Sequence, residues 1–296
     1  MKRILVSVLV TTLVIMLVSP AAFAKPEREK PLPASGVELV KKVTVKGPKA
    51  RGGKPVKEVA TGALGTLCTG SKYAVIVGIS DYPGTANDLE YADDDALDMC
   101  NALTSIYSFN PGNVQLLTNL GATFDAIQEA IMDMKAKAKQ EDEIVFFFSG
   151  HGAKGIASDG DKEKLDEAIV THDGSRVEYI WDGQLKNWFS GFATSRIILI
   201  FDSCLAGGMT DLKASGRVIS MSTTETGTAY ESATWSNGQF TYYFVNEGMV
   251  EGFADKYDNI SGVPDVTIEE AFDYAKANCK SQSPTISDSF QNDLFP

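Results

Sequence analysis

A histidine and a cysteine, each just beyond an apolar run, are the residues of this sequence best suited to chemistry. His151 follows the run at 144–148, and Cys204 follows the run at 197–201, 53 positions further along the chain. Apolar runs of this length are typical of strands that are covered on both faces. Neighbouring parallel strands deliver the residues that follow them to one edge of the sheet. The spacing therefore predicts a thiol nucleophile with an imidazole base.

Small residues surround both candidates. Gly150 and Gly152 flank His151, and a Leu-Ala-Gly-Gly stretch follows Cys204. Such residues let the backbone turn sharply and let a substrate approach closely. The amides of Gly152 and Cys204 are placed to donate to a developing oxyanion. A structural histidine and a plain buried cysteine are the alternative, but their matching positions at two strand ends favour catalysis.

The folded part of the chain alternates between strand and helix patterns. We expect strands at 73–79, 114–117, 144–148, 167–171, 197–201 and 217–222, and helices at 89–107, 124–138, 180–189, 240–250 and 267–279. Thr267 followed by Glu270 is a capping-box signal for the last helix. The alternation predicts an α/β fold in three layers, with a mostly parallel central sheet of about six strands and helices on both faces.

Residues 1–24 have the pattern of a secretory signal peptide. Lys2 and Arg3 precede an apolar stretch, and Ala22–Phe23–Ala24 is a small-x-small cleavage site. An uncleaved anchor is the alternative, although the stretch is short for a bilayer span. No later stretch is long and apolar enough to span a membrane. We therefore expect a secreted mature protein without membrane attachment.

The next segment, residues 25–65, differs in charge from the rest. Ten Lys and Arg stand against four Glu in 25–60, whereas fifteen stand against thirty-five acidic residues in 61–296. The basic segment is rich in Pro and Gly and too poor in apolar side chains to bury a core of its own. We interpret it as a linker or as a propeptide that lies on the acidic domain, residues 66–296. That acidity argues against a nucleic-acid partner.

The four cysteines leave little room for disulfides. Cys204 must stay free if it is the nucleophile, and Cys100 falls on the apolar side of a helical pattern. A bridge between Cys68 and Cys279 is possible in a secreted protein. Two histidines and no CxxC pair make a structural zinc site a poor interpretation.

The motifs FFFSGHG and FDSCLAG resemble those of the caspase-like cysteine peptidases, and of the metacaspases more than the animal caspases. Weaker matches at 89–99, 165–173 and 238–244 extend the resemblance over about residues 72–296. The resemblance implies a caspase-like fold and a Cys-His dyad that needs no cofactor for its chemistry.

It also implies a pocket for a basic side chain. Asp202 and Asp95 match the two pocket aspartates of metacaspases, and Ser149 matches a polar pocket residue. Two carboxylates would select Arg or Lys before the scissile bond, because an unpaired cation there costs much. The expected partners are protein or peptide substrates with such residues, and the chain's own propeptide in a self-processed zymogen.

Calcium is a further implication of the resemblance. Asp166, Asp182 and Asp211 match calcium-binding aspartates of one metacaspase type. The family pattern has another aspartate where this chain has Gly183, so one ligand is missing. Asp159 and Asp161, with Glu163, form a second acidic cluster that we interpret as an exposed loop. Calcium is expected as an activator, completed by carbonyls and water.

Three alternatives remain open at this point. The same fold could cleave after Asn, as legumain does, although Asp95 and Asp202 speak against that. It could be a binding module that has lost catalysis, although His151 and Cys204 are intact. It could transfer its acyl group to an amine instead of water.

Overall fold

The computed structural model describes residues 28–46, 57–159, 165–257, 259 and 265–296. Its central sheet has six strands in the order β13-β10-β9-β5-β3-β4, all parallel except β13, which runs antiparallel to β10. The strands are β3 (Lys72–Gly78), β4 (Val114–Thr118), β5 (Glu143–Ser149), β9 (Ile197–Asp202), β10 (Arg217–Met221) and β13 (Thr285–Asp288). The expected mostly parallel sheet is confirmed.

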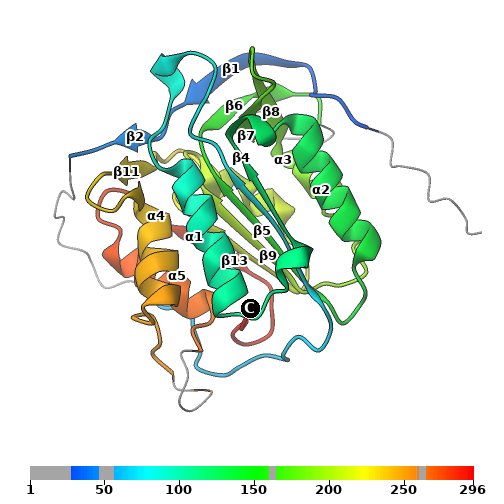
Figure 1. Cartoon of the computed structure of the whole chain (residues 1–296), viewed down its shortest axis with the longest axis vertical. Coiled ribbons are helices and arrows are strands. Elements are labelled where there is room, and N and C mark those ends of the chain that lie inside the picture. Colours follow the sequence, from blue (N-terminus) through cyan, green and yellow to red (C-terminus); the bar gives the residue numbers. More distant parts are fainter. Residues whose placement is uncertain (1–27, 47–56, 160–164, 258, 260–264) are drawn as a thin grey trace, which may run out of the picture.

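Helices cover both faces of this sheet (Figure 1). One face packs on α2 (Phe124–Lys137) and α3 (Asp182–Trp188). The other packs on α1 (Ala92–Ser105), α4 (Gln239–Thr241) with its π-helical continuation η5 (Tyr242–Val250), and α5 (Ile268–Asn278). Short 3-10 turns complete the helical elements: η1 (Thr85–Asn87), η2 (Pro111–Asn113), η3 (Asn119–Gly121) and η4 (Ala206–Leu212).

The buried strand β5 explains why two separate cores form. Phe146 and Phe148 point into the core beneath α2 and α3, whereas Val145 and Phe147 point into the core beneath α1 and α5. Gly78 in β3 lets α1 lie close, because a Cβ there would stand 2.3 Å from the carbonyl oxygen of Ala92. The alternation of strand side chains therefore sets the three layers.

A second, four-stranded sheet lies beside the central one. Its antiparallel order is β1-β6-β7-β8, made by β1 (Ala34–Val40), β6 (Gly152–Ala157), β7 (Asp166–His172) and β8 (Val177–Trp181). The strand expected at 167–171 belongs here, because the unpredicted strand β6 pairs with it. The helix expected at 180–189 starts only at Asp182, since β8 takes the preceding residues.

The basic N-terminal segment is part of this architecture where it is described. Besides β1, it supplies β2 (Val43–Thr44) to a small sheet with β11 (Tyr230–Ser232) and β12 (Asn237–Gly238). Figure 1 shows both N-terminal strands crossing one end of the molecule. The signal-peptide prediction lies outside the described residues, and so does the junction at 47–56.

Two smaller expectations were also tested. The capping box of α5 is confirmed, with Thr267 and Glu270 bonded reciprocally. All four cysteines are free, and no disulfide joins Cys68 to Cys279. Cys68 lies in the loop before β3 and contacts the carbonyl of Glu141. Cys279 follows α5, is buried and contacts the carbonyl of Gln239, so the two thiols have different neighbours. Among the described residues no helix is both long and apolar enough to cross a membrane.

Candidate active site

The pairing of β5 with β9 brings the two candidate motifs together. The strands run parallel, with Ser149 opposite Asp202 in register. His151 and Cys204 each lie two residues beyond these partners, at the carboxyl edge of the sheet. Both are buried, with 1% of each side chain's residue surface exposed. The arrangement expected from the two apolar runs is the one that the fold produces.

Gly152 allows the two motifs to approach each other closely. A Cβ at this position would stand 2.0 Å from the carbonyl oxygen of Cys204 and 2.9 Å from its carbonyl carbon. Any side chain would therefore push the His151 and Cys204 segments apart. The backbone after Cys204 turns at Leu205, which has the left-handed φ of 61° that non-glycine residues rarely adopt.

Two residues, Asn87 and Tyr82, hold His151 in place. Its Nε2 lies 2.7 Å from the carbonyl oxygen of Asn87. A carbonyl can only accept, so Nε2 carries the proton and Nδ1 is the free base. The ring of Tyr82 stacks on the imidazole at 4.7 Å between centroids, and its hydroxyl accepts the backbone N–H of His151. Asn87 and Tyr82 were not foreseen, because nothing local in the sequence links them to His151.

Both members of the pair are electrically neutral in this form. Burial lowers the pKa of the His151 imidazole to about 4 and raises the pKa of the Cys204 thiol to about 11. The sulfur accepts one hydrogen bond, from the backbone N–H of Ala229 at 3.2 Å. A buried neutral thiol is a weak nucleophile. The structure is thus a closed form of the site.

Asp95, Ser149 and Asp202 converge in a buried pocket beside this pair. The hydroxyl of Ser149 donates to Asp95 Oδ2 at 2.6 Å. Asp202 Oδ2 accepts from both the backbone N–H and the hydroxyl of Thr241, at 3.0 and 2.8 Å. Gly238 donates its N–H to Asp95 Oδ1 at 2.8 Å. The sequence singled out the first three residues; Thr241 and Gly238 lie in the weaker motif at 238–244.

The pocket already contains a cation, the side chain of Lys42. Its Nζ lies 3.2 Å from Asp95 Oδ2, 3.1 Å from Asp202 Oδ1 and 3.0 Å from Ser149 Oγ, and the charged side chains are fully buried. Burial alone would lower the pKa of Lys42, but the carboxylates of Asp202 and Asp95 hold it above its ordinary value. Burial raises the pKa of Asp95 to about 6, although Lys42 opposes this. Lys42 was missed in the sequence.

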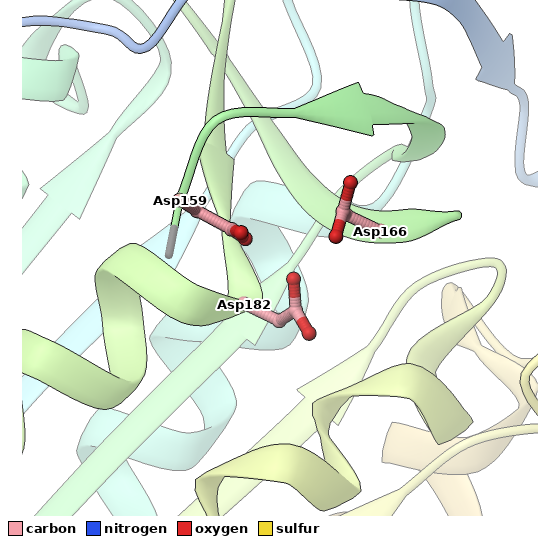
Figure 2. Close-up of side chains that lie close together, drawn as sticks. All are labelled: Asp159, Asp166 and Asp182. Carbon is pink, nitrogen blue, oxygen red and sulfur yellow. The ribbon is translucent and has the colours of Figure 1, made fainter. Parts of the chain in front are cut away.

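A separate group of carboxylates lies near the loop between β6 and β7. Oxygen atoms of Asp159, Asp166 and Asp182 all lie within 4.8 Å of one another. Figure 2 shows the three side chains gathered together. Asp159 takes the place of the carboxylate missing at Gly183: a Cβ on Gly183 would stand 2.5 Å from Asp159 Oδ2. Among the described residues, Asp211 on η4 is not part of this group. Asp159 is half-buried, so the exposed-loop interpretation does not hold for this residue, whereas Asp161 and Glu163 lie outside the described residues.

The three carboxylates fit the chemistry of a calcium site. Calcium prefers six to eight oxygen ligands, and three carboxylates can supply up to six. Asp166 and Asp182 are buried, with 1% and 0% exposed, and each begins an element of the fold, β7 and α3. Two of the three ligands expected from the resemblance are thus brought together, and Asp159 joins them.

This fold and this pair of side chains define a class: an α/β protein with a cysteine and a histidine at the carboxyl edge of a mostly parallel sheet. The sequence profile of the caspase domain matches residues 71–295. The chain therefore belongs to the caspase family.

Similar proteins include several metacaspases. Metacaspase-1 of Pyricularia oryzae is 30% identical over 154 residues, which are 49% of this chain and 39% of that protein. Metacaspase-4 of Arabidopsis thaliana is 30% identical over 149 residues, 48% of this chain and 35% of that protein. The matches thus span well under half the length of these relatives. A crystal structure of a Geobacter sulfurreducens protein shares the fold, with a TM-score of 0.56 at 16% identity, over 74% of this chain and 93% of that one.

The contact at Gly152 gives a first prediction. Gly152→Ala forces the Cys204 carbonyl away, and we expect kcat/KM on an active reporter to fall about 100-fold, as misplacement by about 1 Å does in other enzymes. Gly121→Ala is the matched control, because its Cβ would meet nothing within 4 Å. Equal rates for the two variants would contradict the close approach.

The neutral imidazole gives a second prediction. The pKa of His151 is near 4 in the folded chain and near 6.5 when unfolded, so only the unfolded chain takes up this proton between those values. The folded protein should therefore lose about 3 kcal/mol as pH falls from 6.5 to 4, relative to His151→Gln. Unfolding free energies at pH 7 and pH 4 measure this. The raised pKa of Asp95 increases stability as pH falls, which opposes the effect of His151. Asp95 is present in both the wild type and His151→Gln, so its contribution cancels in the comparison. Parallel pH curves would show that the pKa of the His151 imidazole is not lowered in the folded chain.

Proposed function

We propose that the protein is a secreted cysteine endopeptidase that cleaves after Arg or Lys and is made as a zymogen. The observation that carries the proposal is the buried ammonium of Lys42, which contacts Asp95, Asp202 and Ser149. A pocket that holds one long basic side chain has the depth and the charge to take another. Membership in the caspase family and the likeness to metacaspases support the peptidase chemistry.

The reaction follows from the atoms at the sheet edge. The Cys204 thiol gives its proton to His151 Nδ1, and the thiolate attacks the carbonyl carbon of the Arg or Lys whose side chain fills the pocket. The oxyanion forms near the amides of Gly152 and Cys204. His151 then returns its proton to the leaving amine, which leaves a thioester on Cys204. Water, which is the default acyl acceptor for a secreted enzyme, then hydrolyses the thioester. An amine in place of water would make the protein a ligase.

The pocket favours a basic residue over the alternatives. Asn would place a neutral amide between Asp95 and Asp202 and leave two buried carboxylates without a counter-charge, which is costly. An Asp side chain would add a third negative charge. The legumain-like alternative therefore fits less well than cleavage after Arg or Lys. Arg offers a planar set of donors that suits two carboxylates, so both basic residues are expected substrates.

Secretion is proposed from the sequence of residues 1–24 alone. The basic start, the apolar stretch and the small-residue cleavage site together support export. The basic charge of residues 25–65 and the acidic charge of the domain support a propeptide that stays associated after folding. In a secreted setting calcium is available at concentrations that can saturate weak sites.

Calcium activation is proposed for the group Asp159, Asp166 and Asp182. Asp159 lies just after β6, Asp166 is the first residue of β7, and Asp182 is the first residue of α3. β6 begins at Gly152, beside the dyad, so a metal that fixes the far end of this hairpin would also order its near end. No part of the cysteine chemistry requires the ion.

Specificity tests the proposal most directly. With the full chain, incubated with calcium until its rate is constant, Arg and Lys reporter peptides should be cleaved and Asn and Asp reporters should not. Asp95→Asn removes one ionic partner of the substrate cation and should lower kcat/KM on Arg by roughly 10- to 100-fold. Asp202→Ala should abolish the preference. Asp94→Asn, an exposed neighbour on α1, is the control.

The inactive variant Cys204→Ala must cleave nothing. Unchanged Arg cleavage by Asp202→Ala would favour a different pocket and the legumain-like alternative. Absence of cleavage with every reporter, together with no labelling of Cys204 by an electrophilic Arg ketone, would favour the non-catalytic binding module.

Calcium binding can be tested without activity. Calcium at about 100 times its Kd should raise the unfolding temperature by about 5 °C, whereas Asp182→Asn and Asp159→Asn should lose most of that shift. Asp133→Asn, a partly exposed acid on α2 that pairs with Lys137, is the control. An equal shift in all variants would place the ion elsewhere. A calcium titration of Asp211→Asn decides whether η4 adds a ligand, because weaker binding than in the wild type would place Asp211 at the ion.

A further inference from the structure

The segment that carries Lys42 lies across the whole candidate site. We call residues 34–46 the covering segment. Its strand β1 pairs with β6, with Val40 opposite Gly152, and its strand β2 pairs with β11. Val40 packs against Cys204, Leu205 and Ala229. The covering segment thus occupies the space that a substrate would need, with Lys42 in the acidic pocket formed by Asp95, Asp202 and Ser149.

The direction of the covering segment decides whether it is a substrate. Cleavage after Lys42 requires that the leaving nitrogen, which belongs to Val43, reach His151. Instead, the N–H of Val43 donates to the carbonyl of Ala229 at 3.0 Å. The nitrogen that meets His151 Nδ1, at 3.1 Å, is Lys42's own. The imidazole thus faces the amide that precedes the Lys42 side chain, whereas cleavage after Lys42 needs the amide that follows it.

The neighbouring peptide bond is not presented for cleavage either. Lys42 nitrogen would be the leaving group only if Lys41 filled the pocket. The side chain of Lys41 is exposed, and its Nζ donates to the carbonyl of Ala86 at 2.7 Å. Cleavage needs both a basic side chain in the pocket and the next residue's nitrogen at the imidazole. The bond after Lys42 lacks the nitrogen, and the bond before Lys42 lacks the side chain.

From this geometry we infer that the covering segment is an inhibitory plug that binds the site in reverse and resists cleavage. The inference rests on the proposed function, since it takes His151 as the group that protonates the leaving amine. It differs from a self-cleaving propeptide, in which Lys42 would be the first residue processed.

The plug also blocks the dyad itself. Nε2 of His151 is committed to the carbonyl of Asn87, so Nδ1 is the base that must take the thiol proton. The N–H of Lys42 donates into the lone pair of that nitrogen. The chain is therefore held latent in two ways, through the filled pocket and through the occupied base. Activation requires displacement of the covering segment, not a cut after Lys42.

The test compares full-length variants that differ at one lysine. Lys42→Met removes the ammonium, Lys42→Arg keeps a cation, and Lys46→Met alters an exposed lysine of the same segment. Without calcium or other treatment, Lys42→Met should cleave an Arg reporter at least about tenfold faster at first than the wild type, because more of the protein is open. Lys42→Arg and Lys46→Met should match the wild type.

Intact mass over several hours reports the direction of binding. The wild-type chain should yield no product that begins at Val43, even while it cleaves the reporter. Such a product, absent from Cys204→Ala, would overturn the reversed orientation. A reporter rate for Lys42→Met no higher than that of the wild type, in a variant whose circular dichroism is unchanged, would overturn the inhibition.

A peptide spanning residues 34–46 gives a measurement that does not depend on how Lys42→Met folds. Added to activated wild-type protein, it should inhibit competitively and stay intact, and its Lys42→Ala version should not inhibit. Rapid cleavage of this peptide after Lys42 would overturn the inference.

Binding of agmatine, a small basic probe, separates the plug from catalysis. In the Cys204→Ala background, Lys42→Met should bind agmatine by calorimetry and the Lys42 parent should not. That result would support the plug even if no reporter were ever cleaved, which would defeat the proposed function alone. Equal binding by both proteins would overturn the plug.

Discussion

The pairing of β5 with β9 is the constraint from which the site follows. Their register sets Ser149 opposite Asp202. Two residues later on each strand, the same register delivers His151 and Cys204. One hydrogen-bonded ladder thus fixes both the floor of the pocket and the reacting pair. A register slip of one residue in either strand would turn its side chains to the opposite face of the sheet. It would disrupt the pocket and separate His151 from Cys204.

The second determinant is electrostatic. Asp95 and Asp202 are fully buried and close enough to share one cation. Two buried carboxylates without a counter-charge are strongly unfavourable, so the folded chain needs either a proton or a cation between them. Lys42 supplies the cation in the closed form. The basic segment meets the acidic domain at this buried contact, and it also meets the domain at the surface, where Arg28 pairs with Asp125 and Glu129.

Much of this arrangement could be predicted from local sequence, because it depends on strands that are buried on both faces. Apolar runs place His151 and Cys204, and the alternation of strands and helices places them at the same edge. Features that depend on pairing between distant segments could not be predicted. Strand β6 contains two glycines, two alanines and a single large apolar residue, Ile156, so it gives no strand signal and the partner of β7 was missed. Lys42 lies in a Pro- and Gly-rich stretch, where charge indicated association but no pattern indicated which lysine is buried. Asp159 looked like a loop acid because its relation to Gly183 exists only in three dimensions.

The covering segment also closes the edge of a sheet. While β1 is in place, β6 has hydrogen-bonding partners on both sides, β1 and β7. Once β1 leaves, one side of β6 presents a row of unpaired backbone N–H and C=O groups next to the dyad. Such an edge pairs readily with any extended chain, including another copy of the same protein. The proposed open form would therefore combine its free pocket with an affinity for extended polypeptide, and it would tend to self-associate in a way that the latent form would not.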